Sequence, residues 1–89
     1  MLKVEIKKFT EKELTNMDVF NWPIWEKEVS EFDWSYDERE RCYILEGDVE
    51  ITSENKKITF KKGDFVVFPK GLNCKWKINK AVKKHYNFG

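Results

Sequence analysis

Two short stretches of alternating apolar and polar residues, both interrupted by glycine, constrain the fold of this chain most strongly. The first covers residues 40–51 and is broken at Gly47. The second covers residues 62–71, with a turn at Gly63 and a Pro69-x-Gly71 corner at its end. Short strands that are bounded at close intervals by glycine and proline are typical of small antiparallel barrels. The pattern therefore predicts an all-β fold.

The rest of the chain adds one helix and further strands. Thr10 and Glu13 have the spacing of a capping box, which predicts a short helix over residues 11–17. The segment Asn21-Trp22-Pro23 ends any helix, because proline lacks an amide donor. A hairpin is expected over 41–45 and 49–52, and other strands over 24–36, 57–60, 65–68, 73–79 and 82–88. Seven or eight even strands indicate a barrel or jelly-roll sandwich, in a single domain over residues 1–89.

Alternation within these strands predicts which side chains point into the barrel. Cys74 and Trp76 share one side of their strand, and the lysines beside them mark the solvent side. Glu40 shares a side with Cys42, but the opposite side of that strand is also apolar. We therefore expect the strand that begins at Glu40 to be covered on both sides.

The last strand has one apolar and one polar side. Lys84 lies on the apolar side with Tyr86, whereas His85 lies on the polar side. We expect Lys84 to point inward and His85, the one histidine in the sequence, to be exposed.

Composition excludes several classes of partner. A chain of 89 residues buries only about 60–65% of its unfolded surface, so its four Trp, seven Phe and three Tyr are needed for packing. The net charge of +1 gives no strong field for nucleic acid or an anionic membrane. No apolar run could span a bilayer and no secretion signal is evident, so we expect a cytoplasmic protein. Cys42 and Cys74 are too few for a disulfide framework and are expected to be reduced.

Several of these residues together resemble the cupin family. The segment from Glu40 to Gly47 is similar to the end of the first cupin motif, and the segment from Gly63 to Gly71 is similar to the start of the second. With Trp76 and the closing Lys83-Lys84-His85-Tyr86, they resemble the small cupins (DUF861) grouped with the cupin domain of ureidoglycine aminohydrolase. The resemblance covers roughly residues 22–88 and implies a jelly-roll barrel.

The resemblance also implies a pocket that lacks the usual cupin metal. Cupins hold a divalent metal with histidines and a glutamate, which suit such ions. Carried over by spacing, the histidine positions fall near Trp34 and Tyr36 and on Cys74, and only the glutamate survives, as Glu40. An indole cannot ligate a metal, and one carboxylate with one thiol is a poor centre for iron or manganese. We therefore expect neither a metal nor another cofactor.

Glu40 is the main candidate for a functional residue. A carboxylate inside an aromatic barrel can act as a general acid or base near neutral pH. The alternative is a structural ion pair with Lys84, Arg39 or Arg41. Lys84 could be that counter-ion, because it lies on the apolar side of the last strand.

Three other pocket candidates have a packing interpretation beside the functional one. For Trp34 we favour core packing, since aromatic residues serve packing more often than function. For Tyr36 the two interpretations are evenly balanced, and Glu40 could bond its buried hydroxyl. For Cys74 we favour an inert core thiol over a nucleophile, because no histidine is indicated nearby.

Two classes of function follow from this sequence. In the first, the barrel binds a small polar molecule, or acts on it as a metal-independent enzyme, with Glu40 orienting the ligand or moving a proton. In the second, the barrel is structural and self-associates, with residues 2–9 pairing along the edge of a neighbouring copy. A homodimer is plausible, since small barrels gain burial by association. The residues expected to line a ligand site are Trp25, Trp34, Tyr36, Glu40, Cys74, Trp76, Lys84 and Tyr86.

Overall fold

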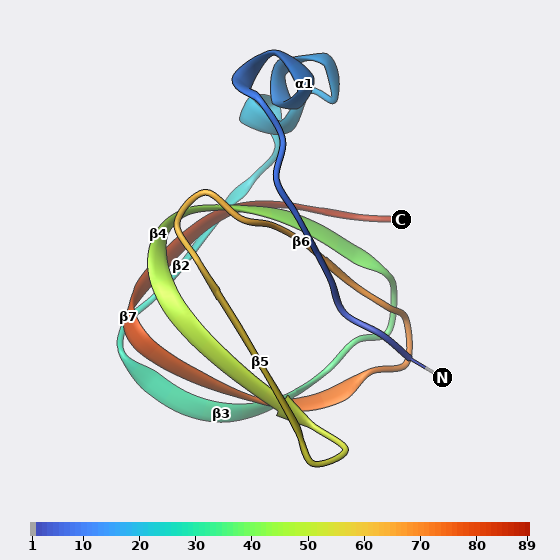
Figure 1. Cartoon of the computed structure of the whole chain (residues 1–89), viewed down its shortest axis with the longest axis vertical. Helices are drawn as coiled ribbons and strands as arrows, with labels where there is room; N and C mark the ends of the chain where they lie inside the picture. Colours follow the sequence, from blue (N-terminus) through green and yellow to red (C-terminus); the bar gives the residue numbers. More distant parts are fainter. Residues whose placement is uncertain (1) are drawn as a thin grey trace.

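The structure is a computed structural model that describes residues 2–89 as one antiparallel sheet curved into a barrel, with two short helices outside it (Figure 1). The all-β class is confirmed. Within the described residues, neither helix is long and apolar enough to cross a membrane. The elements are β1 (Glu5–Lys7), α1 (Glu11–Asn16), the 3₁₀ helix η1 (Val19–Asn21), β2 (Ile24–Lys27), β3 (Ser30–Ser35), β4 (Glu40–Ser53), β5 (Lys56–Lys61), β6 (Phe65–Phe68) and β7 (Asn73–Phe88).

Strands β4 and β7 form the centre of the sheet. They pair with each other along most of their length, from Glu40 opposite Phe88 to Thr52 opposite Lys75. The other edge of β7 pairs with β3 along its first half and with β2 along its second half. The other edge of β4 pairs with β6 at its start and with β5 towards its end. Each long strand therefore holds two shorter strands in place.

The hairpin predicted at Gly47 is wrong, because residues 40–53 form the single strand β4. Pairing between β4 and β7 is irregular from Ile44 to Val49, where bulges let β4 change partner from β6 to β5. Gly47 has a φ of 124°, and a Cβ atom there would lie 2.8 Å from the Cα atom of Val82. Glycine is needed at this position because the backbone of β7 passes so close, and not because the chain reverses.

Two other predicted boundaries differ from the structure. Residues 73–79 and 82–88 are continuous in β7, since no glycine or proline between Asn73 and Phe88 ends the strand. Residues 24–36 divide into β2 and β3, because the chain turns at Glu28, whose backbone oxygen accepts a hydrogen bond from the Ser30 hydroxyl at 2.8 Å.

The N-terminal strand finds its partner within the chain. Residues 2–9 were predicted to pair along a neighbouring copy, but Glu5 to Lys7 lie opposite Phe65 to Val67 of β6. The edge of β6 that β4 leaves free is the available partner. The helix that follows is capped as predicted, with Glu13 N donating to Thr10 Oγ1 at 3.2 Å and Thr10 N donating to Glu13 Oε1 at 3.0 Å.

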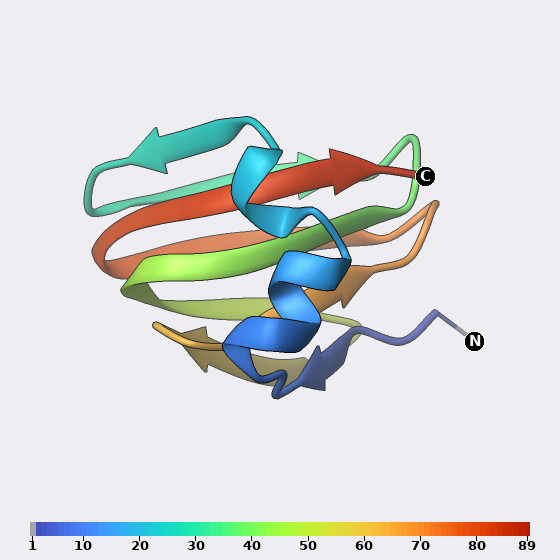
Figure 2. The ribbon, with the colours of Figure 1, turned by 90° about the horizontal axis from the view of Figure 1, so that it is seen from above.

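Residues 2–89 form two apolar cores, one on each side of β4 and β6. The larger core fills the barrel and includes Ile44, Phe68 and Trp76. The smaller core lies outside the barrel, beneath α1 and η1, which cross the strands in front of the barrel in Figure 2. It contains Leu14, Val19, Trp22, Phe65 and Val67. The start of β4 is therefore covered on both sides, as its sequence predicts.

His85 is buried, so its predicted exposure is wrong. Its side chain faces the smaller core, and its Nδ1 atom lies 2.9 Å from the backbone oxygen of Trp22. The ring of Phe20 packs edge-on against it at 6.0 Å. His85 is buried because η1 and Trp22 cover this part of the polar side of β7.

Candidate ligand-binding pocket

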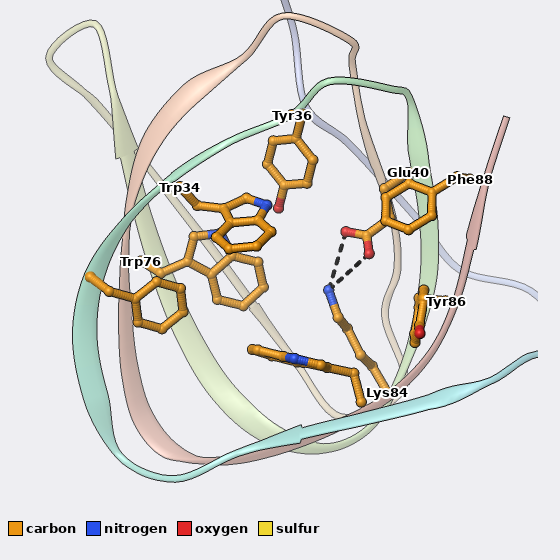
Figure 3. A pocket seen from close by; sticks show the side chains of 9 residues that line it. Trp34, Tyr36, Glu40, Trp76, Lys84, Tyr86 and Phe88 are labelled. Atoms are coloured by element: carbon orange, nitrogen blue, oxygen red, sulfur yellow. Dashed lines mark hydrogen bonds and ion pairs between the residues drawn. The ribbon is translucent and has the colours of Figure 1, made fainter.

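A cavity of about 190 Å³ opens inside the barrel, where side chains from β2, β3, β4 and β7 meet (Figure 3). All but two of its lining side chains are aromatic, and the exceptions are Glu40 and Lys84. This volume is below the roughly 300–1,000 Å³ of pockets that hold drug-sized molecules, so the cavity suits a smaller ligand. The lining residues are Trp25, Phe32, Trp34, Tyr36, Glu40, Trp76, Lys84, Tyr86 and Phe88.

Strand pairing brings these residues together from distant parts of the chain. Lys84, Tyr86 and Phe88 alternate along β7 and therefore face the same side of the sheet. Trp25 lies opposite Lys84 in the pairing of β2 with β7. Phe32 lies opposite Trp76 in the pairing of β3 with β7, and their rings stack at 5.9 Å with an angle of 13°.

The backbone around Tyr36 is fixed by the corner that the sequence marks with Pro69 and Gly71. Tyr36 N donates to Leu72 O at 2.9 Å, and Gly71 N donates to Tyr36 O at 2.7 Å. The Tyr36 ring also stacks on Phe68, with ring centres 4.7 Å apart and an angle of 7°. The second glycine-rich stretch thus serves to position one wall of the pocket.

Glu40 and Lys84 form a buried ion pair at the wall of the cavity. Lys84 Nζ donates to Glu40 Oε1 at 3.2 Å and to Oε2 at 3.3 Å. The exposed fractions of the two side chains are only 7% for Glu40 and 5% for Lys84. Of the three basic residues that the sequence offers as partners of Glu40, namely Lys84, Arg39 and Arg41, Lys84 is therefore the one that pairs with it.

The ammonium of Lys84 is also surrounded by aromatic rings. Its Nζ atom lies 4.9 Å from the ring centre of Trp76, 5.0 Å from that of Trp25 and 5.7 Å from that of Phe68. These distances are within the range of cation–π attraction, which strengthens where water is excluded. The rings and the Glu40 carboxylate together hold the cation in one place.

The Tyr36 hydroxyl has no hydrogen-bond partner within residues 2–89, so the expected bond to Glu40 is not formed. Burial, followed by the negative charge of Glu40, raises the pKa of Tyr36 well above its usual range. Tyr36 is therefore a neutral phenol at physiological pH. The Trp76 indole N–H is likewise buried without a partner.

The two cysteines are buried thiols. Burial raises the pKa of Cys42 to about 12 and the pKa of Cys74 to about 11. The Cys42 Sγ atom also donates a weak hydrogen bond to the backbone oxygen of Val66, at 3.6 Å. Since the thiolate is the nucleophilic form, these positions agree with the interpretation of Cys74 as an inert core residue.

Most of the predicted site residues meet at this cavity, and the ligand role of each remains a prediction. Cys74 is buried in the barrel core but does not line the cavity. Trp34 lines it but is 52% exposed, so the interpretation of this residue as core packing is wrong. Phe32 and Phe88 were missed, although each lies two residues from a predicted member and so shares its side of the strand.

The residues present do not fit the metal site of the usual cupins. Both oxygens of Glu40 bind Lys84, and the indole of Trp34 has no lone pair to donate. Between residues 2 and 89, no group of three or more His, Cys, Asp or Glu side chains is placed to hold a metal ion. An ammonium therefore faces the one carboxylate that the resemblance assigns to the metal.

The barrel, its glycine-rich turns and the retained glutamate define the class of protein. A family model described as the EutQ-like cupin domain matches residues 14–86, and this chain belongs to that cupin family. No match was found among curated proteins.

Solved structures of other proteins share the fold. A DUF861 family protein from Thermotoga maritima is 58% identical, with a TM-score of 0.95 over 98% of this chain and 100% of that one. The EutQ protein of Clostridium difficile is 18% identical, with a TM-score of 0.67 over 98% of this chain and 68% of that one. A putative ethanolamine utilization protein Q from Salmonella typhimurium is also 18% identical, with a TM-score of 0.67 over 96% of this chain and 68% of that one. The last two show likeness of fold alone.

Proposed function

We propose that this cupin binds a small, mostly apolar molecule in the barrel and orients it through one polar group at the Glu40–Lys84 pair. The observation that carries the proposal is a buried ion pair at the wall of a cavity that is otherwise aromatic. Ligand pockets are commonly apolar with a few placed polar groups, which fix orientation and specificity.

Stability alone is a weak explanation for this pair. Desolvation of two buried charges usually offsets most of their attraction, and apolar replacements of similar size are often as stable. A barrel with so many aromatic side chains could have filled the same volume with another ring. The pair instead gives the pocket a hydrogen-bond acceptor in Glu40 and donors in Lys84.

The pair also supplies the groups for a metal-independent proton transfer. A carboxylate in an ion pair is a proton acceptor, and the neighbouring ammonium is a donor. We therefore assign Glu40 the role of general base if the protein is an enzyme. Binding is the more general proposal and does not require catalysis.

Binding can be tested with single-ring compounds that carry different polar groups, namely benzamide, benzoate and benzylamine, with ethylbenzene as the apolar reference. Ligand-observed NMR and the fluorescence of Trp25, Trp34 and Trp76 report on the pocket. The double variant E40Q/K84M removes both charges and avoids leaving one unpaired. We expect it to fold and to lose at least tenfold in affinity for the polar compound that binds best, while ethylbenzene is little affected.

A matched control removes an ion pair on the surface. Lys75 Nζ lies 3.1 Å from Glu31 Oε1, and both side chains are about half exposed. The double variant E31Q/K75M should therefore bind the four compounds as tightly as the wild type does. The proposal is wrong if none of the four compounds binds, or if E40Q/K84M binds the polar compounds as tightly as the wild type.

Self-association is the second candidate function. Phe20 and Ile24 are exposed apolar side chains that both adjoin His85, so they form a small continuous patch. Such a patch can be covered by a second copy of the chain. Sedimentation equilibrium over a wide concentration range tests this function, and a dimer that F20S/I24T dissociates would support it.

A further inference from the structure

Two buried hydrogen-bond donors at the cavity have no partner within the described protein. The exposed fraction of Tyr36 is 3% and that of Trp76 is 2%, and both residues line the cavity. Neither the Tyr36 hydroxyl nor the Trp76 indole N–H has a hydrogen-bond partner in residues 2–89. A buried polar group without a partner is unfavourable, so such groups in native proteins call for an explanation.

The two donors are neighbours. Figure 3 shows the Tyr36 hydroxyl pointing from the segment between β3 and β4 towards the interior, where the indole rings gather. Burial and the charge of Glu40 raise the pKa of Tyr36, and the nearby Trp76 N–H offsets only part of that rise. The two side chains also pack against the same ring, because the ring centre of Phe68 lies 4.7 Å from that of Tyr36 and 5.8 Å from that of Trp76. The two donors form no hydrogen bond with each other.

The charge of the cavity wall sums to zero. Glu40 is paired with Lys84, and Tyr36 is a neutral phenol. An anionic or cationic ligand would have to bring a charge into this apolar cavity without a free counter-charge, which is costly. The wall thus favours a neutral ligand.

We propose that the Tyr36 hydroxyl and the Trp76 indole N–H form a subsite for the carbonyl oxygen of a neutral, single-ring aromatic ligand. The inference rests on the proposed binding function and names the class of ligand. A carbonyl oxygen has two lone pairs and can accept from both donors at once. The half-exposed rings of Trp34 and Phe88 then contact the part of the ligand that lies farther from this subsite.

The amide nitrogen of such a ligand has a partner as well. Glu40 uses one lone pair of each oxygen on Lys84, and a carboxylate offers about four such sites. A ligand that carries an N–H beside its carbonyl, as an aromatic amide does, can therefore donate to Glu40 while it accepts from Tyr36 and Trp76.

The test compares wild type and Y36F with benzamide, benzoate and ethylbenzene as probes. We expect benzamide to bind wild type more tightly than benzoate does, and Y36F to weaken benzamide about tenfold while ethylbenzene is unchanged. Without ligand, Y36F should melt at a higher temperature than wild type, because it removes a buried hydroxyl without a partner. Y43F is the matched control, since Tyr43 packs against the outer core and should alter neither affinity.

NMR of the indole N–H signals gives a readout that does not depend on a variant. Benzamide should shift the Trp76 signal downfield, whereas the Trp22 signal, from the outer core, stays in place. The subsite is wrong if Y36F weakens ethylbenzene as much as benzamide, if the Trp76 signal does not move, or if benzoate binds more tightly than benzamide. Those outcomes leave the proposed binding function standing, whereas failure of every probe to bind wild type would overturn both.

Discussion

Among single residues, Lys84 has the most unusual surroundings. A lysine is rarely fully buried without a partner, and this one lies inside a barrel with only 5% of its side chain exposed. Both Glu40 oxygens and three aromatic rings contact its ammonium. Burial of either charge is therefore tolerated only because the other is present, and the coupling energy between Glu40 and Lys84 can be measured.

We expect the single variants E40Q and K84M each to lower the free energy of unfolding by about 3 kcal/mol, because each leaves one buried charge unpaired. The double variant E40Q/K84M should recover most of that loss, since no charge remains. Urea unfolding of the four proteins gives the coupling energy directly. A double variant as unstable as the sum of the single variants would show that the two residues act independently.

The buried thiols predict a loss of stability at alkaline pH. The pKa of Cys42 rises from 9.0 to about 12 on folding, and that of Cys74 from 9.0 to about 11. The folded state therefore holds these protons more tightly than the unfolded chain. The resulting stabilisation is complete below pH 9 and is lost as pH rises from 9 through the folded values.

The free energy of unfolding, measured in urea between pH 7 and pH 11, checks this expectation. The variant C42A/C74A should start from a lower stability because of the lost packing, but its decline above pH 9 should be shallower. An equal slope for both proteins would mean that other groups cause the alkaline loss.

At the level of elements, Gly47 shows how a turn signal can be misread. Its positive φ and the close approach of Val82 allow β4 to bulge and continue, so that one strand pairs with both β5 and β6. This continuity places Glu40 at one end of β4 and the β5 hairpin at the other. The pocket therefore depends on a bulge in the middle of the strand.

We expect G47A to lower the free energy of unfolding by about 3 kcal/mol or more, because the new Cβ clashes with β7 and the backbone is strained. G63A is the control, since Gly63 also has a positive φ, 91°, but a Cβ there meets no atom within 4 Å. G63A should lower the free energy of unfolding by only about 1–2 kcal/mol, through backbone strain alone. Equal losses in thermal unfolding would show that the approach to Val82 does not matter.

At the level of the whole molecule, the barrel has the cupin fold with a pocket wall made of rings and one ion pair. The ammonium of Lys84 faces the only carboxylate of that wall. A divalent metal would have to displace it and would then find too few ligands.

We therefore expect protein prepared without a chelator to contain no stoichiometric transition metal by elemental analysis. Addition of zinc or manganese should leave the melting temperature unchanged, because a ligand that binds the folded state would raise it. A stoichiometric metal that is lost in E40A would contradict this reading of the ligand positions.

Much of the fold and part of the pocket could be predicted because the relevant signals are local. Alternation placed Trp76 and Lys84 on the inner side of β7, and the capping box placed α1. Predictions were wrong where the surroundings of a residue depend on segments that are distant in the sequence. Nothing near His85 in the sequence shows that η1 will cover it, and nothing near Tyr36 shows that its hydroxyl will lack a partner.

The sequence by itself determined the class of fold, the short helix and the inner side of β7 around Trp76 and Lys84, since period-2 alternation and turn residues act over a few positions. Only the tertiary structure decided that Gly47 bulges, that Lys84 is the partner of Glu40, and that Trp34 lines a cavity. Those outcomes depend on which strands lie side by side, and strand pairing joins residues that are far apart in the chain.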